Sequence, residues 1–363
     1  MRKTARMTSA SDDLVALAGA LPEGWSVGQA DERDATELTD LVRRHEHHAR
    51  GWASSSPEGV RMELSGAGRS TRQNVVARDA RGDVRGWGSA HDRAAGRMLL
   101  RVVVDPGLAD DTADRVADLL FGWGAAAARR VGATRGLVTQ QTDSGAFAGD
   151  RRQHAWLSRH GFTQVRTWWQ MSRPVTPDDA EMRSGTRAGV RIRLVQRQDD
   201  GMPSEHDLRI VHDVLETSFE DHFNSHEETF DEFVSRLRAD PGHRWDHWWI
   251  AELVDGEGDP VPAGALVASV SGTGGGPAEG SYVEYIGVLQ NARGRGVATS
   301  LLRTVIADAA VRQRDRVGLE VDADSPTRAD ALYTSMGWRT VYVTESWHKD
   351  VPVPAPPVVP AWA

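Results

Sequence analysis

The order of the predicted elements repeats once along this chain of 363 residues. In each half, a strand leads into a long helix, then another strand, then a short helix closed by glycine and an aromatic residue. A shared order over about 70 residues indicates two copies of one α/β domain rather than a chance match. The short helices align without a gap, Ala155-Trp156-Leu157 and Gly161-Phe162 against Ala331-Leu332-Tyr333 and Gly337-Trp338.

Hydrophobic periodicity places these elements along the chain. In the first half we expect a helix over 112–131, a short helix ending at Gly161, and strands at 74–78, 85–91, 98–104, 137–140 and through Trp168 and Trp169. In the second half we expect helices over 207–219, 230–237 and 297–312, a short helix ending at Gly337, and strands at 190–195, 248–253, 262–271, 281–289, 317–321 and 339–343.

Composition along the chain suggests the domain boundaries. Residues 1–22 form a polar leader that we expect to be flexible, and residues 23–175 form the first domain. Residues 176–189 contain Pro, Gly and Ser and are the predicted linker. The second domain is expected over 190–350, and the Pro-rich residues 351–363 form an extended tail.

The overall charge and composition exclude several classes of function. The formal net charge is −9, with 52 acidic against 43 basic residues, which argues against binding a polyanion such as nucleic acid over a broad face. The chain has no cysteine, so disulfides and thiolate chemistry are excluded. No apolar run is long enough to cross a membrane, and the N-terminal segment does not resemble a signal peptide. We expect a cytoplasmic protein that is a monomer or a homodimer.

The segment from Glu284 to Leu302 carries the most chemical information. A predicted strand runs into a basic loop with Gly294 and Gly296, and the loop runs into an amphipathic helix. Glycines let the backbone approach a ligand, and a helix N-terminus presents unpaired N–H groups, so a phosphate or pyrophosphate suits this site. An ordinary strand-to-helix turn with two surface arginines is the alternative. The Gly-Lys-Ser/Thr of a P-loop is absent, and Thr299 replaces the third glycine of a dinucleotide motif.

The same segment resembles the GCN5-related N-acetyltransferase (GNAT) family. Arg293 to Ala298 match the family's Arg/Gln-x-x-Gly-x-Gly/Ala loop, and Ala331 to Trp338 match its Leu-Tyr-x-x-x-Gly-Phe segment. The resemblance covers about residues 190–350 well and reaches residues 23–175 only through the internal repeat. It implies two tandem domains, each a mixed, mostly antiparallel sheet flanked by helices. The tandem layout is also similar to that of mycothiol synthase-like acetyltransferases.

The resemblance assigns roles to particular residues. It implies acetyl-CoA as acyl donor and Tyr333 as the acid that protonates the departing thiolate. The backbone around Val288 would bond the pantetheine arm, and Ser325 stands where the family often has an asparagine that contacts coenzyme A. The pyrophosphate would be held by Arg293, Gly294, Arg295, Gly296, Val297 and Ala298.

An attacking amine must lose a proton, because amines of the lysine type are mostly protonated at pH 7. Glu284, on the strand before the loop, is the candidate base, and a solvated strand carboxylate is its alternative interpretation. Tyr285 is a lesser candidate, expected on the opposite face because side chains alternate along a strand.

In the N-terminal copy, Leu157 stands in place of Tyr333 and cannot donate a proton. The acidic segment from Asp105 to Asp111 replaces the phosphate loop, and its carboxylates would repel a pyrophosphate. We therefore expect only the C-terminal copy to be catalytic.

These features predict an acetyl-CoA-dependent N-acetyltransferase that acts on a primary amine of a small molecule, such as an amino sugar, an antibiotic or a metabolite, by direct attack. Another acyl donor on the same fold and a non-catalytic coenzyme A-binding protein remain alternatives.

Two polar clusters stay outside this assignment. His45, His47 and His48 are interpreted as a solvated helix face, and no metal is expected. The segment from Asp221 to Glu228 is either an exposed polar loop or a border of the acceptor site.

Overall fold

The protein is described by a computed structural model that covers residues 19–66, 68–93, 97–185, 187–199, 201–220, 229–238, 243–254, 259–272, 279–324 and 329–354. The chain divides into two compact units. Unit 1 comprises Met1–Arg166 with Thr344–Ala363, and unit 2 comprises Thr167–Val343. None of the helices in the described ranges combines the length and apolarity needed to cross a membrane.

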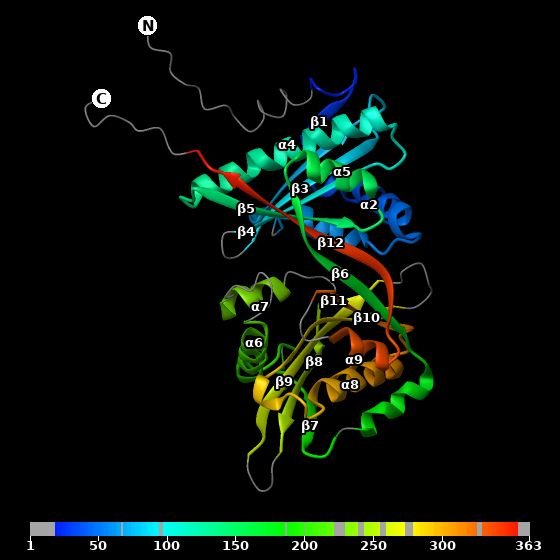
Figure 1. The fold of residues 1–363 in the computed structure, drawn as a ribbon, viewed down its shortest axis with the longest axis vertical. Coiled ribbons are helices and arrows are strands. Elements are labelled where there is room, and N and C mark those ends of the chain that lie inside the picture. The colour runs from blue at the N-terminus through cyan, green and yellow to red at the C-terminus, as the bar shows by residue number, and fades with distance from the viewer. Residues whose placement is uncertain are drawn as a thin grey trace, which may run out of the picture. The chain divides into compact units, whose positions relative to one another are not determined.

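Unit 1 contains a sheet in the order β1-β2-β3-β4-β5-β12, covered by helices on both faces (Figure 1). The neighbours are antiparallel except for β4 and β5, which are parallel. Its elements are β1 (Ser26–Gln29), α2 (Ala35–Arg50), α3 (Pro57–Leu64), β2 (Arg72–Arg78), β3 (Val84–Asp92), β4 (Arg97–Val104), α4 (Asp110–Thr134), β5 (Thr139–Phe147) and α5 (Arg151–Arg159).

Unit 2 repeats this architecture in the order β6-β11-β10-β9-β8-β7 (Figure 1). Here β10 and β11 are the parallel pair. Its elements are β6 (Thr163–Pro174), η4 (Pro177–Gly185), β7 (Val190–Leu194), α6 (Glu205–Phe219), α7 (Phe230–Arg238), β8 (His243–Leu253), β9 (Val261–Ser271), β10 (Gly280–Val288), η5 (Gln290–Ala292), α8 (Val297–Val311), β11 (Arg316–Asp322) and α9 (Ala329–Ser335). The last strand, β12 (Arg339–Pro352), follows α9 along the chain and joins the sheet of unit 1.

Each sheet separates two hydrophobic clusters, because apolar side chains alternate between its faces. In unit 1, α4 and α5 pack on one face around Leu120 and Leu157, and α2 and α3 pack on the other around Trp87. In unit 2, α8 and α9 cover one face, and α6 and α7 cover the other. The predicted α/β class and the mostly antiparallel sheets are therefore confirmed.

The last strand of each half does not complete the half that precedes it. Residues 168–174 of β6 pair with β11 in unit 2, and residues 344–352 of β12 pair with β5 in unit 1. The sequence analysis had assigned the strand through Trp168 and Trp169 to the first domain. Both strands mix aromatic and β-branched residues with polar ones, so their local pattern does not distinguish one partner from the other.

The segments proposed as leader, linker and tail are partly packed. Leu21 is buried in the core of unit 1, and η4, within the predicted linker, lies against α8. At the other end, β12 continues to Pro352, and the backbone N–H of Val353 donates to the carbonyl of Val138 at 2.9 Å. Residues 1–18 and 355–363 lie outside the described residues.

Candidate active site

The loop between β10 and α8 leaves a helix N-terminus without a side-chain cap. Gly294 and Gly296 have φ of 76° and 81°, a left-handed conformation that favours glycine. Gly296 is the N-cap of α8, no side chain accepts a hydrogen bond there, and the first turn has no acidic residue. The helix dipole and the first N–H groups of α8 are thus uncompensated by side chains of the described residues, as an anion site requires.

Arginines surround this loop. Arg293 and Arg295 are exposed on it, as the sequence analysis expected of phosphate-binding residues. Arg187, which the sequence analysis did not consider, lies against Gly296: a Cβ added at Gly296 would stand 2.8 Å from its Cδ. Arg187 comes from the segment before β7, so only the packing of η4 and its continuation on α8 reveals it.

The strand before the loop separates from its parallel neighbour. β10 pairs with β11 only through Ser281, Tyr282 and Val283, whereas it stays paired with β9 as far as Val288. In the described residues, no side chain hydrogen bonds to the backbone of Ile286, Gly287 or Val288 on the edge that β11 leaves. Backbone groups at such an edge can bond an extended ligand.

Glu284 occupies a β-bulge in β10. The register with β9 shifts between Val283 and Tyr285, so Glu284 is the extra residue. Its carboxylate accepts a hydrogen bond of 2.6 Å from the hydroxyl of Ser269 on β9. Ser269 lies two residues after Val267, which packs with α6, so this carboxylate lies on the α6 face of the sheet.

The bulge also corrects the expected position of Tyr285. Instead of pointing to the opposite face, Tyr285 packs in the cluster with α6, and its ring lies 6.5 Å from that of Phe219. A bulge places two successive residues against one partner residue, which breaks the alternation on which the expectation depended.

Other polar side chains, missed by the sequence analysis, line the α6 face near Glu284. Gln170 on β6 donates to the carboxylate of Glu320 on β11, and the hydroxyl of Tyr282 donates to Gln170 Oε1 at 3.4 Å. Burial raises the pKa of Tyr282, and the charges of Glu320 and Glu284 raise it further. These residues come from β6, β10 and β11, which are distant in sequence, so no local motif points to them.

Tyr333 lies on the other face, in α9. Its side chain is 7% exposed and packs in the same cluster as Val297, with its ring edge-on to Trp338 at 6.1 Å. Burial raises the pKa of Tyr333 to about 12. Its phenol is therefore protonated at neutral pH and has a proton to give.

The remaining predictions concern Ser325, the polar segment 221–228 and the histidines of α2. Ser325 and the segment from Asp221 to Glu228 lie outside the described residues. His47 and His48 are exposed, but His45 packs against Phe147 with ring centroids 5.6 Å apart, which differs from the predicted solvated face. The described residues contain no group of three potential metal ligands.

In unit 1, protein side chains fill the corresponding strand edge. β4 pairs with β5 only from Arg97 to Leu99. Beyond that point Ser144 donates to the carbonyl of Leu100 at 2.8 Å, and Gln153 donates to that of Val102 at 3.4 Å. An extended ligand would have to displace these buried hydrogen bonds.

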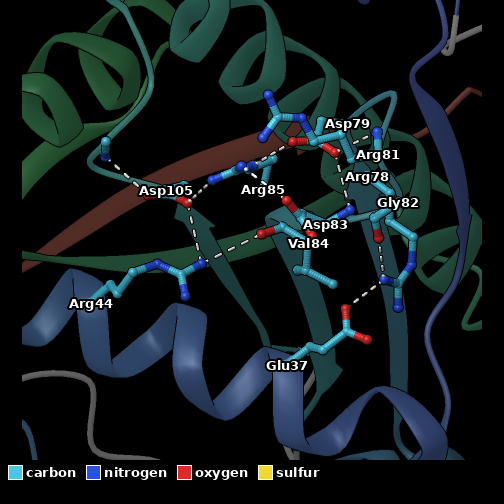
Figure 2. A network of polar contacts seen from close by, with 11 residues as sticks. Glu37, Arg44, Arg78, Asp79, Arg81, Gly82, Asp83, Val84, Arg85 and Asp105 are labelled. Atoms are coloured by element: carbon cyan, nitrogen blue, oxygen red, sulfur yellow. Dashed lines mark hydrogen bonds and ion pairs between the residues drawn. The ribbon is translucent and has the colours of Figure 1, made fainter.

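Arginines of unit 1 itself bond to the acidic loop that follows β4. Arg152 donates to the carbonyls of Pro106 and Leu108, each at 3.3 Å, and α4 begins with Asp110 and Asp111. Figure 2 shows the first residue of this loop, Asp105, held between Arg44 and Arg85. Although burial opposes ionisation, hydrogen bonds from the Gly107 N–H and from Arg85 lower the pKa of Asp105.

Part of unit 2 matches a known protein family. Residues 209–338 match the model of the Acetyltransferase (GNAT) family. This part of the chain is a GNAT domain. The match contains β10, the loop, α8 and Tyr333, and it supports acyltransferase activity for the domain. No curated protein matches the sequence of the chain.

Solved structures extend the likeness in fold beyond the GNAT domain. A GCN5-related N-acetyltransferase from Sphaerobacter thermophilus is 20% identical, covers 92% of this chain and 98% of its own, and has a TM-score of 0.69. A tandem GNAT protein from the clavulanic acid biosynthesis pathway is 16% identical, and the match covers 92% of this chain and 100% of that protein. Its TM-score is 0.64.

An N-myristoyltransferase of Saccharomyces cerevisiae is 11% identical, and the match covers 90% of this chain and 80% of that protein. Its TM-score is 0.57. These matches confirm the tandem GNAT fold. The narrower resemblance to mycothiol synthase-like enzymes stays a prediction.

Proposed function

We propose that the protein is an acetyl-CoA-dependent N-acetyltransferase whose chemistry lies in unit 2 alone. One observation carries the proposal. The GNAT domain has an uncapped α8 N-terminus beside a strand edge that β11 leaves, whereas unit 1 has side chains in the corresponding positions. A coenzyme A ester would supply an activated acyl carbon at such a site.

The groups at the loop suit a coenzyme A pyrophosphate. Amides at the start of α8, from Val297 and Ala298, would donate to it together with those of Gly294 and Gly296. The guanidinium groups of Arg293 and Arg295, with Arg187 beside Gly296, would balance its charge. The backbone edge at Val288 would bond the pantetheine arm and hold a donor where negative charge develops on the carbonyl.

Glu284 would accept a proton from the acceptor amine, directly or through water. The hydrogen bond from Ser269 fixes the orientation of its carboxylate. Glu284 and Glu320 both act on Tyr282 electrostatically, so this face favours a cationic acceptor such as a primary amine. Tyr333 would give its proton to the departing thiolate from the α8 face, where burial keeps the phenol neutral.

Isothermal titration of the full chain with acetyl-CoA tests the donor site, and turnover with a panel of amines tests the reaction. We expect saturable binding, and we expect Tyr333→Phe to lower kcat by about 10²–10⁴-fold with the acetyl-CoA affinity unchanged, as for loss of a general acid. Glu284→Gln should also lower kcat and should change its pH dependence.

Two results would contradict the proposal. Absence of heat and saturation with acetyl-CoA would remove the donor site. Equal turnover by wild type and Tyr333→Phe, with no amine acetylated above background, would favour a non-catalytic coenzyme A-binding protein. Repeating the assay with longer acyl-CoA donors tests the other alternative, because preference for one of them would keep the fold and change the donor.

A further inference from the structure

Unit 1 carries a cluster of basic side chains on the α3 face of its sheet, which we call the Arg72 cluster and define as Arg72, His91 and Arg101. Arg72 on β2 stands directly opposite His91 on β3, and Arg101 on β4 stands opposite Ser89, two residues before His91. The three side chains therefore lie on one face of three adjacent strands.

The acidic side chains of the described residues near this cluster already have partners. Glu63, at the end of α3, accepts hydrogen bonds from Arg101, which also lies over the ring of Trp87 at 4.6 Å. Asp143 on β5 is paired with Arg97 at 2.6 Å and with His348 at 3.0 Å. Glu63 is thus paired with Arg101 of the cluster itself, and Asp143 is paired with side chains outside the cluster.

Arg72 is the member of the cluster whose side chain has no direct polar partner among the described residues, although Glu63 acts on it electrostatically. Its side chain is partly buried, and in the described part of the chain it makes no hydrogen bond or ion pair within 4.0 Å. Burial lowers the pKa of Arg72, which the charge of Glu63 opposes, and Arg101 and Arg93 lower it further. A partly desolvated guanidinium beside a second one is stabilised when an anion binds between them.

His91 lies in the positive electrostatic potential of the neighbouring arginines. Burial and the charges of Arg72, Arg93 and Arg101 lower its pKa to about 3, so its ring is neutral at physiological pH. A neutral imidazole can still donate one hydrogen bond to an oxyanion. Arg101 keeps 38% of its side chain exposed, so a ligand can reach the cluster from solvent.

We propose that the Arg72 cluster binds an oxyanion, a phosphate ester or a carboxylate, and that unit 1 is therefore a ligand-binding domain. The planar guanidinium groups of Arg72 and Arg101 would hold two of its oxygens, and His91 would donate to a third. The inference does not depend on acetyl transfer in unit 2. The site uses strands of unit 1 rather than of unit 2, and a ligand opposite in charge to the proposed acceptor.

Calorimetric titrations of the full chain with inorganic phosphate and, separately, with citrate at low ionic strength test this site. We expect saturation with at least one of the two, and the one that binds identifies the ligand as a phosphate ester or a carboxylate. Arg72→Gln should weaken binding by about tenfold or more, the scale of one charge-assisted hydrogen bond, whereas Arg72→Lys should retain part of it. Arg115→Gln, on the exposed face of α4, is the matched control and should bind like wild type.

The loop of unit 2 is a second possible anion site, so each titration is repeated with the Arg293→Ala, Arg295→Ala double variant. The component that depends on Arg72 should remain there. Nuclear magnetic resonance of the His91 ring supplies an independent readout: its pKa should rise from about 3 when the anion binds, and also in Arg72→Gln. Lack of saturation with both anions, equal affinity in Arg72→Gln, or loss of all binding in the double variant would overturn the proposal.

Discussion

Units 1 and 2 share one topology but differ in the hydrogen bonding of the central strand that separates from its parallel neighbour. In unit 2, β10 leaves β11 after Val283, and the α8 N-terminus beside it lacks a cap. In unit 1, β4 leaves β5 after Leu99, but Ser144 and Gln153 donate to carbonyls of β4. Arg152 donates to the carbonyl of Pro106 in the loop that follows. The same topology thus leaves this strand edge without side-chain hydrogen bonds among the described residues of one copy and bonds it internally in the other.

The comparison shows that one topology can leave these backbone groups without side-chain partners among the described residues or can satisfy them from within. Buried polar groups require partners, and in unit 1 side chains supply them. At the position where unit 2 has Tyr333, unit 1 has Leu157, which is buried in its core.

The largest expected effect is on stability, and it tests whether unit 1 can be destabilised without loss of structure in unit 2. Trp347 lies in β12 but is buried in the core of unit 1. Trp347→Ala should lower the free energy of unfolding of unit 1 by about 3–5 kcal/mol, because it leaves a large cavity. Amide hydrogen exchange should show lost protection in β5 and α4 and unchanged protection in α8. Val341→Ala, on the exposed part of the same strand, is the control, and loss of protection in unit 2 for Trp347→Ala would contradict the assignment.

The second prediction concerns alkaline stability. The pKa of Tyr333 is about 12 in the folded state and about 10 when exposed. The neutral phenol is favoured by folding, so this stabilisation is complete below pH 10 and is lost as the pH rises from 10 to 12. Wild type should lose about 2–3 kcal/mol relative to Tyr333→Phe over this range.

Urea unfolding of both proteins at several alkaline pH values measures this loss. Tyr282, whose pKa is also raised, is present in both proteins, so its contribution cancels. Parallel pH dependence of the two unfolding free energies would show that Tyr333 is not desolvated in unit 2.

The third prediction compares the two loops directly. Arg293→Ala with Arg295→Ala should weaken acetyl-CoA binding by about 1–3 kcal/mol, through loss of charge-assisted hydrogen bonds to phosphate. Asp110→Ala, at the start of α4 in unit 1, should leave the dissociation constant unchanged. Calorimetric titration with acetyl-CoA measures the dissociation constant of each variant. An equal change in both would contradict the proposal that only unit 2 binds acetyl-CoA.

The smallest expected effect concerns the hydrogen bonds that occupy unit 1. Ser144→Ala removes the donor to the buried carbonyl of Leu100 and should lower the free energy of unfolding of unit 1 by about 1–2 kcal/mol. Ser335→Ala, which removes an exposed hydroxyl on α9, should change stability by less than about 0.5 kcal/mol. Equal effects would mean that the strand edge in unit 1 is not stabilised by Ser144.

Local sequence determined much of this protein. Periodicity predicted most strands and helices of the sheets, because burial against a flat or helical surface requires a fixed repeat of apolar residues. The sequence also predicted a glycine-containing loop before the helix near Val297, and the structure shows that Gly294 and Gly296 adopt positive φ there. The internal repeat predicted that the two halves share a fold, and the contrast between Tyr333 and Leu157 was readable in the sequence itself.

Only the tertiary structure decided the rest, because it depends on contacts between residues that are distant in sequence. Strand exchange of β6 and β12 reflects which sheet edge each strand meets. The bulge at Glu284 reversed the expected face of Tyr285, since one extra residue shifts the alternation. Three pairs come together only when the chain is folded: Arg187 with Gly296, Gln170 with Glu320, and Arg72 with His91.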